Sequence, residues 1–260
     1  MIPLSDPEKL RYHRHLILDE IGEAGQTLIR NTRFLVVGAG GLGCPVIQYL
    51  TATGAGVIGI VDNDQVEISN LQRQVFYGFN DIGKLKSIVA SAKMKRLNGL
   101  VDLETINCRL TAHNAMEIME DYDVVLDCTD NLESRYVISD ACILLNKPMI
   151  HAGIHKYQGQ VSVFNYNNGP SYRCLHPETT PANLIPRPVL GIYNMIPGII
   201  GLMQANEAIK VVTGAGEPLS GRLMIYNALS SQFLFIDIER NPENFDRQTL
   251  MTRFTEAKTI

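Results

Sequence analysis

Short apolar runs alternate with segments of helical periodicity along the first half of the chain. Each run has the length of a buried strand, and the intervening segments place apolar residues three and four positions apart. This alternation is typical of βαβ units, so we expect an α/β fold with a Rossmann-like, mostly parallel sheet and helices on both faces. The predicted strands are 34–37, 57–61, 103–107, 124–126 and 149–151, and the later predicted helices are 84–96, 114–119 and 131–146.

The pattern changes in the second half of the chain. Residues 166–194 form a proline-rich segment that is too long for an ordinary connection, and 195–212 are expected to be helical despite Pro197. Three further strands alternate in the antiparallel manner and bring the sheet to about eight strands. These predicted strands are 160–165, 222–226 and 232–238.

The two ends of the chain are expected to lie outside this sheet. Ser5 and Glu8 have the spacing of a capping box and start a helix. We expect Gly22 and Gly25 to break this helix, because glycine disfavours a helix interior. The tail from Arg240 is polar and is expected to be peripheral.

A glycine-rich turn follows the first predicted strand. The sequence GAGGLG places glycines at 38, 40 and 43, a helical segment follows, and the next strand ends on Asp62. This order forms the dinucleotide-binding fingerprint, in which phosphate oxygens approach the N–H groups of a helix N-terminus. The Asp62 carboxylate can accept hydrogen bonds from ribose hydroxyls. The pattern predicts a nucleotide site and leaves open whether the nucleotide is NAD or ATP.

Other polar residues occupy positions where ligands or helix caps are expected. Asp130 and Asn131 follow the fourth predicted strand, at the edge where α/β sheets bind ligands, although either could cap the next helix. Lys86 lies in a first helical turn, where the macrodipole disfavours a cation, so either a nearby anion or solvent exposure is expected. Arg14 shares a helix face with Arg11, a pattern that favours a solvated face.

Composition narrows the class of protein. The 260 residues carry a net charge of −4, so no basic field points to nucleic acid as a partner. The first residues lack the apolar stretch of a signal peptide, and no apolar run approaches the ~20 residues that span a membrane. The five cysteines contain no CxxC pair, which argues against a disulfide framework. We therefore expect a cytoplasmic protein with neither a membrane nor a nucleic-acid partner.

A series of motifs extends over nearly the whole chain. They are RYHRH, VVGAGGLG, Asp62-Asn63-Asp64, SNLQRQ, Gly83-Lys84-x-Lys86, DCTDN with Arg135, GIHKYQGQVSVF and QANEAIK. In order and spacing they resemble the motifs of the ThiF/MoeB/HesA adenylyltransferases, the bacterial relatives of ubiquitin-activating enzymes. SNLQRQ and DCTDN are specific to that family among Rossmann-like proteins.

The resemblance implies ATP and Mg²⁺ rather than NAD. It implies that AMP is joined to the C-terminal Gly-Gly carboxylate of a ubiquitin-like sulfur-carrier protein of the ThiS/MoaD type, with release of pyrophosphate. Asp62 would hold the ribose, Asp130 would bind Mg²⁺, and Arg14 would complete the site of the other protomer in a homodimer. The implied catalytic residues are Arg14, Arg73, Lys86 and Asp130. The implied nucleotide-binding residues are Gly38, Gly40, Gly41, Asp62, Asp64, Ser69, Asn70, Leu71, Gln72, Arg73, Lys86, Asp130 and Asn131.

The chain departs from the family at its cysteines. Many relatives hold a structural zinc on two CxxC pairs, which would fall here at Ser171 and Cys174 and at Asn244 and Arg247. One thiolate cannot form a tetrahedral zinc site, so we expect no zinc and a small buried Cys174. The family's reactive cysteine would fall near Arg187, and no cysteine follows Cys174. A separate sulfur donor is therefore expected.

We interpret residues 1–260 as a single adenylation domain. Its parts are N-terminal helices (1–32), a nucleotide-binding half (33–152), a carrier-binding half (153–240) with a crossover segment (166–194), and a tail (241–260). Three alternatives stay open: an NAD-dependent dehydrogenase, a carrier-binding scaffold without turnover, and an enzyme that adenylates another peptide or small carboxylate. The sequence does not indicate whether the pathway leads to thiamine, molybdopterin or another product.

Overall fold

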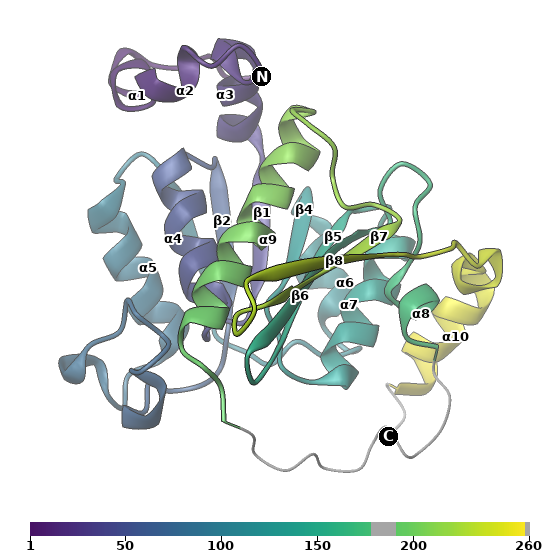
Figure 1. The fold of residues 1–260 in the computed structure, drawn as a ribbon. Helices are drawn as coiled ribbons and strands as arrows, with labels where there is room; N and C mark the ends of the chain where they lie inside the picture. The colour runs from purple at the N-terminus through teal and green to yellow at the C-terminus, as the bar shows by residue number, and fades with distance from the viewer. Residues whose placement is uncertain (178–190, 258–260) are drawn as a thin grey trace.

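A mixed sheet of eight strands forms the centre of the molecule (Figure 1). The computed structural model describes residues 1–177 and 191–257. The strand order is β3-β2-β1-β4-β5-β6-β7-β8, with parallel pairing from β3 to β5 and antiparallel pairing from β5 to β8. The predicted fold class is therefore confirmed. The strands are β1 (Arg33–Val37), β2 (Val57–Val61), β3 (Asp102–Ile106), β4 (Val124–Asp127), β5 (Met149–His155), β6 (Gln158–Phe164), β7 (Arg222–Asn227) and β8 (Gln232–Asp237).

Helices cover both faces of the parallel half of the sheet. Side chains of β1 alternate between the faces: Phe34 and Val36 pack into one apolar cluster, and Leu35 and Val37 pack into the other. The first cluster includes residues of α4 (Gly43–Thr53), α5 (Lys86–Leu97) and α9 (Met195–Thr213). The second includes residues of α6 (Ala115–Glu120), α7 (Leu132–Leu144), α8 (Tyr172–Leu175) and α10 (Arg247–Ala257). Short 3-10 turns are η1 (Ile68–Asn70), η2 (Phe79–Asp81) and η4 (Pro242–Phe245).

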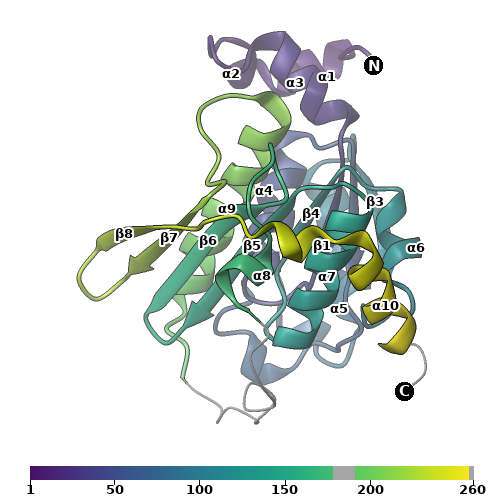
Figure 2. The same ribbon diagram turned by 90° about the vertical axis from the view of Figure 1, so that its right-hand side faces the viewer.

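The N-terminal helices form a separate layer beyond the amino ends of the parallel strands (Figures 1 and 2). They are α1 (Asp6–Arg11), α2 (His13–Leu16) and α3 (Gly22–Asn31). The first helical stretch ends at Leu16, before the expected break; Gly22, with φ of +57°, begins α3, and Gly25 lies inside that helix. A Cβ at Gly25 would lie 3.1 Å from Cγ2 of Ile21 and 3.5 Å from Cγ2 of Thr213 on α9. Glycine therefore serves close packing of α3 here rather than termination.

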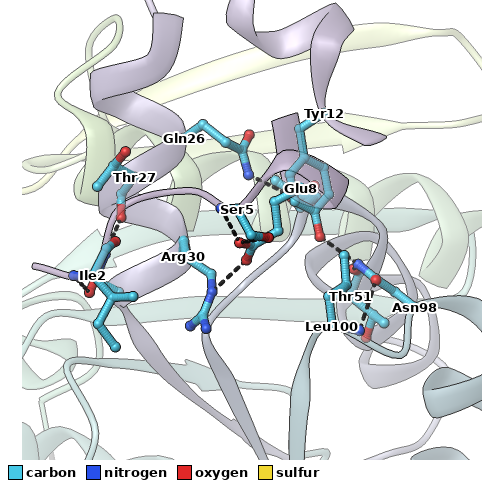
Figure 3. A network of polar contacts seen from close by, with 12 residues as sticks. Ile2, Ser5, Glu8, Tyr12, Gln26, Thr27, Arg30, Thr51, Asn98 and Leu100 are labelled. Carbon is cyan, nitrogen blue, oxygen red and sulfur yellow. Dashed lines mark hydrogen bonds and ion pairs between the residues drawn. The ribbon is translucent and has the colours of Figure 1, made fainter. Parts of the chain in front are cut away.

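Polar contacts hold the helices of this N-terminal layer together and attach the layer to the rest of the molecule (Figure 3). The Glu8 carboxylate accepts hydrogen bonds from Ser5 N at 2.8 Å and from Arg30 Nε at 2.6 Å. Burial alone would raise the pKa of Glu8, but the Ser5 hydrogen bonds and the Arg30 guanidinium lower it below its usual value. The Tyr12 hydroxyl accepts a hydrogen bond of 2.8 Å from Asn98 Nδ2, which follows α5. Helix α2 thus has a fixed position relative to the sheet.

The C-terminal tail packs on the molecule, contrary to the expectation that it is peripheral. Leu250 and Phe254 on α10 are 1% and 6% exposed and join the apolar cluster that contains α7. The two residues are four positions apart and so share one face of the helix. Within the described ranges, no helix combines the length and the apolar character needed to cross a membrane.

Candidate active site

A cleft of about 1050 Å³ opens at the carboxyl ends of β1, β2 and β4. This is the edge at which open α/β sheets bind ligands. The cleft brings together the glycine turn, the end of β2, the segment that follows it, the start of α5 and the loop after β4. The sequence-predicted residues that line the cleft are Gly38, Gly40, Gly41, Asp62, Asp64, Ser69, Asn70, Gln72, Arg73, Lys86, Asp130 and Asn131.

The glycine turn has a geometry that larger residues would disrupt. Gly38 has φ of +98°, in the left-handed region that favours glycine. A Cβ at Gly43 would lie 2.0 Å from the carbonyl oxygen of Gly38, so this helix start can approach the preceding strand only with glycine. The turn therefore leaves a backbone surface at the start of α4 that a phosphate can approach.

Asp62 supports the same turn from the end of β2. Its Oδ2 accepts a hydrogen bond of 2.7 Å from Ala39 N, and its Oδ1 accepts one of 2.8 Å from Asp64 N. Burial raises the pKa of Asp62 even though these two N–H groups lower it. Each carboxylate oxygen retains a lone pair, so Asp62 can also accept hydrogen bonds from ribose hydroxyls.

Cationic side chains lie on one side of the cleft. Lys86 begins α5, and its side chain is only 7% exposed, so solvation does not explain this cation in a first helical turn. Its Nζ is 2.8 Å from Asp64 Oδ2, which supplies the nearby anion that the sequence led us to expect. Arg73 donates a hydrogen bond of 3.1 Å from Nη1 to Ser69 O and retains further donors. Asn70 is buried and joins this turn through its side chain.

Asp130 and Asn131 have different environments in the loop after β4. Asn131 caps α7, because its Oδ1 accepts a hydrogen bond of 2.9 Å from Ser134 N. Asp130 is exposed and lines the cleft. In the described part of the chain, no cluster of three or more His, Cys, Asp or Glu side chains could hold a metal ion. A Mg²⁺ ion at Asp130 would therefore need oxygens from the nucleotide and water, a set that suits this cation.

Two predicted site residues lie outside the cleft of their own chain. Leu71 packs beside the small apolar cluster that contains Val66 and Tyr77, so its side chain contributes to packing rather than to the cleft. Arg14 is exposed on α2, beyond the amino ends of the strands, whereas the cleft lies at their carboxyl ends. Arg14 can therefore contact such a cleft only in a second copy of the chain.

The surroundings of Cys174 do not fit a zinc ion. Its Sγ receives N–H groups from Ser171 and Asn241, both at 3.3 Å, and lies 3.5 Å from Nδ2 of Asn244. Burial alone would raise the pKa of Cys174, but these hydrogen-bond donors stabilise the thiolate and lower the pKa below its usual value. N–H donors stabilise a sulfur and cannot bind a metal, so this set of neighbours does not fit a zinc ion. Cys174 is partly exposed rather than fully buried as expected, and position Arg187 lies outside the described residues.

The cleft also contains residues that sequence analysis did not select. Cations from three separate segments reach it: Arg109 after β3, Arg135 on α7 and Lys156 after β5. Arg109 pairs with Glu133 at 2.9 Å. The sequence indicates Arg135 only together with the DCTDN motif, because nothing in its local sequence shows that α7 directs it toward the strand ends.

The sheet, its glycine turn and the cleft at its strand ends define a Rossmann-like α/β protein with an anion-accepting site. The ThiF family model matches residues 12–247, so the chain belongs to the ThiF family. It is 44% identical to a sulfur carrier protein adenylyltransferase from Thermus thermophilus over 89% of this chain and 88% of that protein. It is 46% identical to a probable molybdopterin-synthase adenylyltransferase from Porphyra purpurea, over 87% of this chain and 60% of that protein.

Longer relatives and solved structures extend this comparison. The chain is 41% identical to the adenylyltransferase and sulfurtransferase MOCS3 of Xenopus laevis and covers 52% of it, about half of that protein. The crystal structure of E. coli MccB with ATP has the same fold, with a TM-score of 0.81 and 22% identity over 92% of this chain and 73% of that one. PaaA is similar, with a TM-score of 0.79 and 21% identity over 92% of this chain and 76% of that one.

Proposed function

We propose that this protein is an ATP-dependent adenylyltransferase that activates the C-terminal Gly-Gly carboxylate of a ubiquitin-like sulfur-carrier protein. The observation that carries the proposal is the cleft, which gathers a glycine turn, a ribose-type carboxylate and cations. The glycine turn and Asp62 would also suit NAD, but Arg73, Lys86 and Asp130 together have no role in hydride transfer to NAD. The relative from Thermus thermophilus, matched over most of both chains, carries the same activity in its name.

The reaction brings two anions together. A carboxylate oxygen of the carrier forms a bond to the α-phosphorus of ATP, and the bond from that phosphorus to the bridging oxygen breaks. Pyrophosphate leaves with the electron pair, so negative charge grows on the leaving group. Fixed cations stabilise such charge most strongly in a partly buried site, and Lys86 and Arg73 are placed for this role. The glycine turn at Gly38 and Gly41 holds the nucleotide, and Asp62 orients its ribose.

Mg²⁺ fits the exposed carboxylate of Asp130 and, when bound, would supply further positive charge beside the phosphates. We assign residues 33–152 to nucleotide binding and 153–240 to the carrier. A large apolar surface in the second segment supports this division. Strand β8 is exposed along its length, and Phe233, Leu234 and Phe235 are 49–57% exposed at the open edge of the sheet (Figure 2). Apolar surface of this kind is typical of a docking site for another protein.

We further propose a homodimer in which Arg14 of each protomer completes the cleft of the other. Arg14 is exposed at the end of its own protomer that lies opposite to the cleft, and this position supports the arrangement. Sulfur would come from a separate donor, because the position of the family's reactive cysteine, near Arg187, is not followed or preceded by a cysteine within residues 175–194. The five cysteines are all free thiols, which supports a reducing, cytoplasmic location.

Mass spectrometry of the carrier tests the activity. The protein would be incubated with ATP, Mg²⁺ and a Gly-Gly-ended ubiquitin-fold carrier encoded in the same genome. We expect the carrier to gain the mass of an AMP group joined to its carboxylate as an acyl-adenylate, a mixed anhydride, and a carrier lacking its last glycine pair to gain none. A carrier that binds but keeps its mass would contradict the proposal and favour a scaffold. AMP transfer to a different peptide or small carboxylate would change the substrate class.

A further inference from the structure

A second cavity of about 470 Å³ lies next to the nucleotide cleft. Its walls come from the start of α7, the β5–β6 hairpin and α8. Arg135, Ile154 and His155 line both spaces, so these residues form the junction between them. A molecule that reacts at the nucleotide could therefore extend from the cleft into this cavity past Arg135.

Arg135 keeps hydrogen-bond donors available at this junction. A guanidinium has five N–H donors, and one Nη2 donor of Arg135 bonds Thr129 O at 2.9 Å. Its Nε is buried 3.9 Å from Asp127 Oδ2 and has no hydrogen-bond acceptor within the described residues, so the donors available at the junction are those of the two terminal nitrogens. The side chain is 15% exposed, so its position is fixed while part of the guanidinium faces the two cavities.

Asp127 supplies a buried negative charge behind Arg135. Both Asp127 and His151 are completely buried, and His151 Nδ1 lies 2.7 Å from Asp127 Oδ2. Burial lowers the pKa of His151 overall, although Asp127 raises it, so the imidazole is neutral near pH 7. A neutral imidazole must carry its proton on Nδ1 to donate to the carboxylate. The oxygen Oδ1 of Asp127 accepts hydrogen bonds from Thr129.

The closest hydrogen bonds of Asp127 thus go to His151 and Thr129, and Arg135 is attracted to Asp127 without a direct hydrogen bond. Tyr172 lies close enough to Arg135 for its hydroxyl to interact with the guanidinium. Its ring is fully buried, its hydroxyl has no well-formed hydrogen bond among the described residues, and it lines the second cavity. Burial raises the pKa of Tyr172, and the adjacent Arg135 guanidinium partly opposes this. Asp127 and Tyr172 therefore act as positioning residues for Arg135.

We propose that Arg135 binds the terminal carboxylate of the acceptor polypeptide and that the second cavity holds the residues just before that carboxylate. This inference rests on the proposed function. A guanidinium matches a carboxylate in shape and charge and can form two parallel hydrogen bonds with it. Such a contact offsets the repulsion between the carboxylate and the phosphates, and each carboxylate oxygen keeps a second lone pair with which it can attack the α-phosphorus. The attraction between Arg135 and the buried Asp127 positions the guanidinium before the acceptor arrives.

A double-mutant cycle tests this contact directly. A Gly-Gly-ended ubiquitin-fold carrier from the same genome would be prepared with its natural carboxylate and as a C-terminal carboxamide. Binding of each form would be measured by calorimetry to wild type and to Arg135→Gln in the presence of a non-hydrolysable ATP analogue. We expect Arg135→Gln to weaken binding of the carboxylate form about 10- to 100-fold, as for a lost charge-assisted hydrogen bond. Binding of the carboxamide form should change less than about twofold.

Further variants separate this role from a structural one. Arg135→Lys retains the charge without the paired geometry and should lose part of the discrimination between the two carrier forms. Tyr172→Phe should raise the KM for the carrier and leave the KM for ATP unchanged. The matched control is Arg96→Gln, because Arg96 is an exposed arginine on α5. This variant should change neither the discrimination between the two carrier forms nor the KM for the carrier.

The outcomes distinguish this inference from the proposed function. If Arg135→Gln weakens binding of the carboxylate and carboxamide forms equally, or weakens binding of neither, the assignment of Arg135 would be overturned. Pyrophosphate exchange by the wild type together with that result would leave the proposed function standing. A wild type that neither binds nor adenylates the carrier would overturn both.

Discussion

Arg14 is predicted to act on the cleft of a second protomer, and paired variants can measure this. Arg14 is exposed on α2 at the end of the molecule opposite to the cleft, and Arg73 lines the cleft itself. Arg14→Ala and Arg73→Ala should each reduce exchange between pyrophosphate and ATP to about 1% of wild type or less, the usual effect of losing one charge-stabilising group.

A heterodimer with one variant of each kind should recover activity. Both substitutions then fall in the same site, and the other site is intact, so the expected rate is about half that of wild type per dimer. The heterodimer can be isolated by co-expression with two affinity tags and tandem purification. Recovery would exceed the single-variant background by about fiftyfold, far above assay error.

The matched control is a heterodimer of wild type with the double variant. If Arg14 acts across the interface, one site lacks Arg73 and the other lacks Arg14, so activity should stay near background. If Arg14 acts within its own chain, this control should retain about half of the activity. An Arg14→Ala/Arg73→Ala heterodimer no more active than the separate variants would refute the shared site.

Three further predictions concern the cleft and the N-terminal layer. Asp130→Asn should lower pyrophosphate–ATP exchange at least about 100-fold without changing the melting temperature, because Asp130 is exposed; near-normal exchange would refute its role. Gly43→Ala should abolish ATP binding measured by calorimetry, because the new Cβ would lie 2.0 Å from Gly38 O; unchanged affinity would contradict the tight turn. Glu8→Gln should reduce the unfolding free energy by about 2 kcal/mol at pH 7, by weakening the buried pair with Arg30. The lowered pKa of Glu8 means that this contribution is complete above its ordinary pKa of 4.5 and is lost as the pH falls further; a difference that persists at pH 3 would show that the charge is not responsible.

The parts of the molecule that the sequence predicted are those set by local pattern. The alternating apolar runs identified the parallel strands, and the glycine turn with Asp62 identified the cleft because its geometry depends on neighbouring residues. The side chain of Leu71 packs against a small apolar cluster instead of lining the cleft, because a motif does not show which of its side chains face inward. The spacing of four residues between Leu250 and Phe254 indicates an apolar helix face that could be buried. The polar residues around them led instead to the expectation of a peripheral tail.

The second cavity could not be predicted in the same way. Arg135 and Tyr172 are far apart in sequence and meet only because α8 packs beside α7 and the β5–β6 hairpin. The buried pair of Asp127 and His151 depends on β4 and β5 lying next to each other in the sheet, where the two residues are in register. Such contacts follow from topology rather than from the spacing of residues in one segment.

Carrier-dependent exchange of labelled pyrophosphate into ATP tests the central claim most directly. The purified protein would be assayed with Mg²⁺ and with each Gly-Gly-ended ubiquitin-fold carrier encoded in the same genome, alongside the same carriers with a C-terminal carboxamide. We predict exchange with a carboxylate-ended carrier and none with its carboxamide, because only a carboxylate can form the reversible acyl-adenylate. If the protein binds ATP but none of the carriers supports exchange, the proposed adenylation would be contradicted.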